Sequence, residues 1–158
     1  MDLRVSGGKE LARISRELRT VGNGREIRKQ LGKELRTAAL PLVPAVRASI
    51  QAIPAATGQS SGLRSRLAKA TRLSVKTTGR TASIRILVDG RKMPDGERAL
   101  PAYIEGTKPN WRHPVHGHKG TWVRQQAHPY FYKVVRPLGR KSRTAVIRTL
   151  DEISKKIS

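Results

Sequence analysis

The chain has 158 residues, of which 37% are hydrophobic and 28% are charged, and it contains no cysteine. These totals suit one domain with its own hydrophobic core, and no run reaches the roughly 20 apolar residues that a membrane-spanning helix needs. Without cysteine, disulfides, thiolate zinc sites and cysteine nucleophiles are excluded. The N-terminal residues lack an apolar stretch behind a basic start, so we expect no secretory signal and synthesis in the cytoplasm.

The dominant property is charge, because 33 Lys and Arg against 11 Asp and Glu give a net +22. Residues 35–88 contain nine basic residues and no acid, and residues 108–150 contain ten basic residues and no acid. Such an excess attracts nucleic acid, an anionic membrane or an acidic protein surface. The sequence therefore predicts an acidic partner, although a solvated surface gives the same pattern.

The first third of the chain predicts a short strand followed by helices. Residues 3–5 alternate and end at a Gly-Gly turn, and helical spacing from Leu11 to Val21 predicts a first helix, which Gly22-Asn23-Gly24 should end with a left-handed cap. A second apolar stripe at steps of three and four predicts one long helix; its members are Ile27, Leu31, Leu35, Ala38, Leu42, Val46, Ile50 and Ile53. Pro41 and Pro44 predict a kink or a break inside it.

The remainder predicts a hairpin, loops and a last helix. Residues 54–62 read as a loop, and residues 73–77 and 82–88 alternate around Thr78-Gly79-Arg80, which predicts an antiparallel hairpin with one apolar and one basic face. Residues 89–99 read as a loop, 102–105 as a short strand or turn, and 106–120 as a long irregular stretch. Helical spacing returns from Ser142 to Ile157.

Neither a metal site nor a catalytic site is expected. His113, His116 and His118 lie within six residues and His128 follows, but the loop offers no cysteine or carboxylate to complete a ligand set. No phosphate-binding or nucleophile motif occurs, and Glu105 is expected to pair with an Arg or to cap the adjacent turn.

Two groups of residues are candidates for binding partners. All six aromatic residues lie between positions 103 and 132, interleaved with basic residues, which is typical of a base-stacking surface or of a protein interface. We expect Phe131 in the core, and an interface at Trp111, Arg112, Trp122 and Arg124. The basic residues of the hairpin, Lys76, Arg80 and Arg85, are expected to contact either DNA in a ring lumen or acidic neighbouring subunits, and the sequence does not rank these two.

Three segments, in this order, resemble a family of small head-to-tail joining proteins of long-tailed bacteriophages, called neck or tail-completion proteins. The first is a strand, a Gly turn and two helices that lead into Thr57-Gly58 and then Leu63-Arg64. The second is Tyr103, Glu105, Gly106 and Thr107, and the third is His128, Pro129 and Phe131, before the last helix.

The resemblance implies an α+β fold over residues 1–158, in which an N-terminal helix and a long Pro-kinked helix pack on a small antiparallel sheet with a C-terminal helix. The long loop is expected at about 106–126. It also implies a non-enzymatic virion subunit without a cofactor, in a six- or twelvefold ring between a head-side connector and tail-side proteins, with genomic DNA in the channel. A tail-terminator ring subunit and a free basic nucleic-acid-binding protein are the alternatives.

Overall fold

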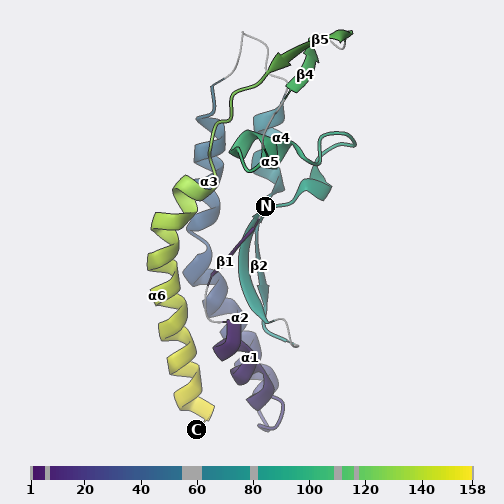
Figure 1. The fold of residues 1–158 in the computed structure, drawn as a ribbon. Helices are drawn as coiled ribbons and strands as arrows, with labels where there is room; N and C mark the ends of the chain where they lie inside the picture. The colour runs from purple at the N-terminus through teal and green to yellow at the C-terminus, as the bar shows by residue number, and fades with distance from the viewer. Residues whose placement is uncertain are drawn as a thin grey trace.

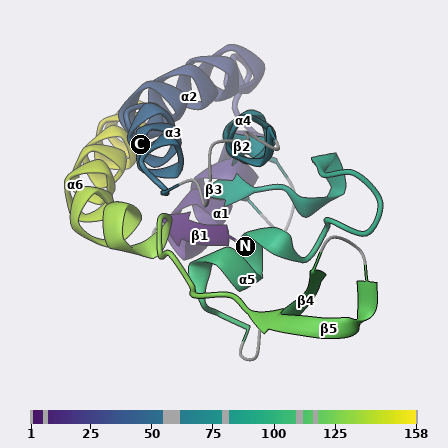
Figure 2. The same ribbon diagram turned by 90° about the horizontal axis from the view of Figure 1, so that it is seen from above.

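The protein is an α+β structure in which helices cover the apolar face of a small antiparallel sheet (Figures 1 and 2). The computed structural model describes residues 2–5, 8–54, 62–78, 82–108, 112–115 and 118–157, with the backbone alone described for residues 2–5, 8, 113–115, 118 and 119. The elements are β1 (Asp2–Val5), α1 (Gly8–Glu17), α2 (Gly24–Ala39), α3 (Leu42–Gln51), α4 (Leu63–Ala70), β2 (Thr71–Lys76), β3 (Ser83–Val88), η1 (Gly90–Lys92), α5 (Leu100–Glu105), β4 (Arg112–Val115), β5 (His118–Arg124) and α6 (Tyr132–Ile157). The predicted fold class is confirmed.

The turn between α1 and α2 depends on a close backbone approach. A Cβ atom on Gly24 would lie 1.9 Å from the carbonyl oxygen of Leu18, so no other residue fits without moving the turn. The expected left-handed cap is wrong, because among the described glycines only Gly62, Gly96 and Gly106 have a positive φ. Glycine is required at position 24 for space rather than for its backbone angle.

The long apolar stripe belongs to two helices, as the prolines predict. α2 ends at Ala39 and α3 begins at Leu42, and the backbone at Leu40 and Pro41 keeps right-handed helical angles between them. Pro44 lies in the first turn of α3, where its missing N–H costs no helical hydrogen bond. The buried stripe therefore continues across the break; it consists of Leu31, Leu35, Ala39, Leu42, Val46 and Ile50.

The predicted hairpin forms two strands of a three-stranded sheet in the order β1-β3-β2, with antiparallel pairing throughout. In β3, Ile84, Ile86 and Val88 are buried and the alternate residues are half-buried. The register aligns Leu73 with Ile86 and Val75 with Ile84, so apolar residues share one face. The predicted separation into an apolar and a basic face is confirmed.

Five elements differ from the expectations or were not expected. Residues 63–70 form α4, for which the sequence analysis made no prediction, and residues 100–105 form a short helix rather than a strand or turn, with Pro101 in its first turn. The span expected as a loop at about 106–126 contains the antiparallel strands β4 and β5. α6 begins at Tyr132, ten residues before the predicted start at Ser142, and carries Pro137 inside it.

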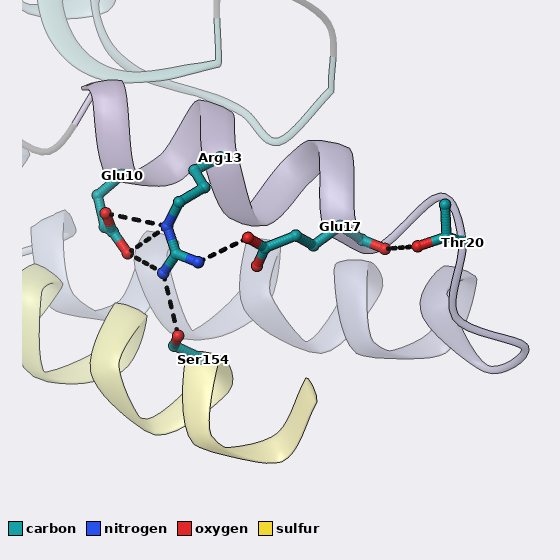
Figure 3. Close-up of polar contacts among 5 residues, drawn as sticks. All are labelled: Glu10, Arg13, Glu17, Thr20 and Ser154. Atoms are coloured by element: carbon teal, nitrogen blue, oxygen red, sulfur yellow. Dashed lines mark hydrogen bonds and ion pairs between the residues drawn. The ribbon is translucent and has the colours of Figure 1, made fainter. Parts of the chain in front are cut away.

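The core is one cluster to which helices α1 to α4, the central strand β3, the Tyr130-Phe131 segment and α6 contribute. α6 lies alongside α2 and α3, and the β4–β5 ribbon extends at one end of the elongated molecule (Figure 1). Arg13 of α1 donates hydrogen bonds to Ser154 near the end of α6 (3.1 Å) and to Glu17 (2.6 Å), and it also pairs with Glu10 (Figure 3). None of the helices within the described residues has the length and apolar content to cross a membrane.

Candidate functional site

Two of the three segments that carry the phage resemblance meet at one buried carboxylate. Glu105, at the end of α5, is buried, and its Oε2 accepts hydrogen bonds from the backbone N–H groups of Tyr130 (2.7 Å) and Phe131 (2.8 Å). Its Oε1 accepts one from Tyr132 N–H (2.9 Å), the first residue of α6. The first N–H groups of a helix have no intrahelical acceptor and carry partial positive charge, so a carboxylate there is stabilising.

Glu105 therefore caps the N-terminus of α6. The expectation that it pairs with an Arg or caps the adjacent turn is wrong, since its partners lie 25 to 27 residues along the chain. Three amides occupy both carboxylate oxygens, which leaves the group positioned for holding a helix rather than for transferring a proton.

Further contacts join the same two segments. The N–H of His128 donates to the carbonyl oxygen of Ile104 (2.8 Å), and the Thr107 hydroxyl donates to the carbonyl oxygen of Ala102 (3.0 Å). Gly106 ends α5 with a φ of 81°, and a Cβ there would lie 3.1 Å from Cβ of Ala127. Residues 101–107 and 127–132 thus form one unit, which we call the Glu105 clamp.

Two aromatic residues of the clamp, Tyr130 and Phe131, belong to the core, as expected for Phe131. Tyr130 and Phe131 are fully buried, and the Tyr130 hydroxyl donates to the carbonyl oxygen of Pro101 (3.3 Å). Burial and the nearby charge of Glu105 raise the pKa of Tyr130. Phe131 also contacts Tyr132 edge to face, with ring centroids 5.2 Å apart, while Pro129 is exposed and Tyr103 is half-buried.

The first resemblance segment is placed only in part, because Thr57 and Gly58 lie outside the described residues. Leu63 begins α4 and packs against the core. The Arg64 guanidinium donates to the carbonyl oxygen of Ile53 (3.0 Å), just beyond the end of α3. Arg64 therefore ties α4 to the helix that precedes it.

The basic hairpin residues lie together on the sheet face opposite the core. Lys76 stands opposite Ser83, and Arg85 stands opposite Ser74 in β2 and Arg4 in β1. Lys76 is exposed and Arg85 half-buried, whereas Arg80 lies outside the described residues. Arg72 shares this face and is paired with the buried carboxylate of Asp89 (2.6 Å).

The predicted interface residues lie on the β4–β5 ribbon. Arg112 is directly opposite Arg124, and Trp122 is opposite Pro114, which puts these residues on one face of the ribbon. Arg112, Trp122 and Arg124 are all exposed, and Trp111 lies outside the described residues. Within the described residues β4 and β5 form a two-stranded sheet, and the like charges of Arg112 and Arg124, directly opposite one another, destabilise such a pair.

The histidines are only partly described. His116 lies outside the described residues, and for His113 and His118 the backbone alone is described. In the part of the chain whose side chains are described, no three His, Cys, Asp or Glu residues form a group that could hold a metal ion. His128 takes part in the clamp through its backbone.

The chain matches no known family model, no curated protein and no solved structure. The likeness to neck proteins therefore rests on the three segments and on how the chain arranges them.

A basic surface on α6 was missed by the sequence analysis. Lys133, Arg136, Arg140 and Arg143 are exposed and recur at steps of three and four, on a side of the helix next to its buried residues. Pro137 and Gly139 are typical helix breakers, so the sequence predicted no helix before Ser142. The signal that could have found this surface is the continuation of the apolar spacing back from Val146 to Val135.

Proposed function

We propose that this chain is a non-enzymatic structural subunit of a long-tailed bacteriophage virion, where it forms a ring of six or twelve copies at the head-tail junction. The ring joins a head-side connector to tail-side proteins and leaves a passage for genomic DNA. A tail-terminator ring subunit is a close variant of the same proposal.

The Glu105 clamp carries the proposal. The resemblance lies in short segments of common turn residues, and the proposal is supported by two of them forming one structural unit. Two of them, residues 103–107 and 128–131, meet around one buried carboxylate that three backbone amides occupy. The arrangement of helices on a small antiparallel sheet also agrees with the fold that the resemblance implies.

A free nucleic-acid-binding protein is the second candidate, and the exposed cations of α6 favour it. That function needs no ring, because a monomer with a net charge of +22 attracts duplex DNA or RNA by itself. The two functions therefore differ in their state of assembly.

The test is the mass of the purified full-length protein in solution, measured by light scattering and by analytical ultracentrifugation, with negative-stain electron microscopy of the same sample. The ring proposal predicts a closed particle of six or twelve copies with a central opening, formed alone or on mixing with a connector ring. A persistent monomer that binds DNA with nanomolar affinity would contradict it.

A further inference from the structure

The exposed side of α6 carries a continuous row of cations. Lys133, Arg136, Arg140 and Arg143 follow one another at steps of three, four and three residues, which places them on one side of a helix with 3.6 residues per turn. Lys141 and Arg148 are also exposed and flank this row. The side of α6 that faces the body of the protein holds the buried residues Val135, Ser142, Val146, Leu150 and Ile153. We call the six cations the α6 stripe.

No acidic group of the described chain neutralises the α6 stripe. None of its six members makes an ion pair among the described residues, and no acid lies between Glu105 and Asp151 in the sequence. The chain uses its acids elsewhere: Glu10 and Glu17 pair with Arg13, Asp89 with Arg72 and Arg91, Asp95 with Arg98, and Glu97 with Arg66. The cations of the α6 stripe are thus left without an intramolecular counter-charge among the described residues.

The geometry of the stripe fits a row of phosphates. The ten residue steps from Lys133 to Arg143 span about 15 Å along the helix axis, over which one strand of duplex DNA presents roughly four phosphates. Arg136 is held over the ring of Tyr132, 5.4 Å from its centroid, and a guanidinium stacked in this way keeps its in-plane donors for an anion. Three of the four residues in the row are arginines, which bind phosphate oxygens with two parallel hydrogen bonds.

The composition of this side argues against recognition of adenine edges and against a protein interface. α6 contains no Asn or Gln, the side chains that read adenine edges. The core of a protein interface combines arginine with aromatic and apolar anchors, so arginines without such anchors are not typical of it. Between Lys133 and Arg143 the only large apolar side chain that is exposed is Leu138, which lies on the flank of the buried side.

We infer that the α6 stripe binds the phosphate backbone of duplex DNA without reading its sequence. The ring function places DNA in the passage without assigning α6 to it, and the second candidate function cites the α6 cations without saying what they contact. This inference goes beyond both, because it names the residues that bind and the phosphate backbone as their ligand. The interaction is electrostatic and depends on the number of phosphates that the stripe contacts.

The experiment compares two double variants of the full-length protein. R140Q with R143Q removes two charges from the centre of the stripe, and R25Q with K29Q removes two exposed charges from one face of α2, so both variants have the same net charge. Binding of a fluorescent duplex of mixed sequence is followed by anisotropy between about 50 and 200 mM salt. Circular dichroism of both variants checks that they are folded.

In the stripe variant, we expect the slope of log association constant against log salt concentration to become less steep by about 1.8, which corresponds to the loss of two phosphate contacts. Binding should weaken by at least about tenfold near 200 mM salt. The α2 variant should change the slope by less than half as much. Equal effects of the two variants would overturn the inference, because they would mean that net charge alone decides binding. Binding of poly-L-glutamate as tight as that of the duplex would also overturn it, because the stripe would then suit an acidic protein.

The same samples separate this inference from the proposed function. If the stripe variant forms normal rings and binds DNA as tightly as the wild type, the inference is refuted and the ring proposal stands. A monomer whose DNA affinity depends on the stripe refutes the ring proposal and supports the inference.

Discussion

The Glu105 clamp predicts that replacing its buried glutamate by glutamine lowers the stability of the fold far more than the same replacement at a partly exposed glutamate. In E105Q, the amide oxygen can still accept the N–H groups of Tyr130 and Phe131, but a neutral acceptor weakens both bonds. The amide nitrogen then faces the N–H of Tyr132, which loses its acceptor at a partly buried site. A hydrogen bond to a charged group contributes about 1.5 to 3 kcal/mol, and an unsatisfied buried donor costs about 1 to 3 kcal/mol.

From these contributions we expect E105Q to lower the free energy of unfolding by about 3 kcal/mol. For a chain of this size the melting temperature should fall by about 6 to 12 °C. The matched control is E97Q, because the Glu97 carboxylate also accepts three hydrogen bonds, all from Arg66, but at a partly exposed site. We expect E97Q to cost less than about 1 kcal/mol.

The assay is urea unfolding followed by circular dichroism at a salt concentration where all proteins have the same state of assembly. Amide hydrogen exchange adds a local measurement, since the amides of Tyr130, Phe131 and Tyr132 should exchange faster in E105Q while those of α2 do not. The reasoning is refuted if E105Q and E97Q lose the same stability, or if the three amides exchange at unchanged rates.

Three further predictions concern single positions. Hydrogen bonds from Arg91 and Arg72 hold the pKa of Asp89 at about 2, below its ordinary 3.8, so the ionised carboxylate stabilises the fold above about pH 4 and this contribution is lost as the pH falls through about 2. Between about pH 6 and pH 2 the wild type should therefore lose about 1 kcal/mol more than D89N in urea unfolding, a value reduced because both arginines are exposed; equal losses would contradict the assignment. G106A should cost about 1 to 2 kcal/mol, because Gly106 has a positive φ and its Cβ would crowd Ala127, whereas G22A, which meets no atom within 4 Å, should be neutral or stabilising in the same thermal melts. P137A should raise the urea midpoint by the equivalent of about 2 to 3 kcal/mol, since it restores an N–H inside α6, and a lower midpoint would show that the proline relieves strain there.

The sequence predicted those elements whose signals are local. In the strands on either side of residues 78–80, apolar and polar side chains alternate over most positions. The break between α2 and α3 follows from Pro41, because proline has no N–H to donate to the preceding turn. The apolar spacing of Leu31, Leu35, Val46 and Ile50 also placed the core of these helices correctly.

The elements that it missed depend on contacts distant in sequence. α6 continues through Pro137 because Val135 is buried against the body and because Glu105 caps its first turn, and neither contact is visible from the spacing of neighbouring residues. β4 is short and contains a proline, and it pairs with β5 across a register shift after Pro114. The position of Glu105 was singled out, but its partners lie more than 20 residues away, beyond the reach of any local capping rule.

The clamp also determines which part of the protein tolerates changes of sequence and length. Because His128 N–H bonds to Ile104 and Glu105 bonds to Tyr130, both ends of the excursion from residue 107 to residue 126 are fastened at the same place on the body. For a loop whose ends are already joined, doubling its length costs only about 0.6 kcal/mol of closure entropy. Mutation can therefore lengthen, shorten or replace the ribbon while the helices and the sheet stay folded, so the surface offered to a partner can diversify faster than the body that carries it.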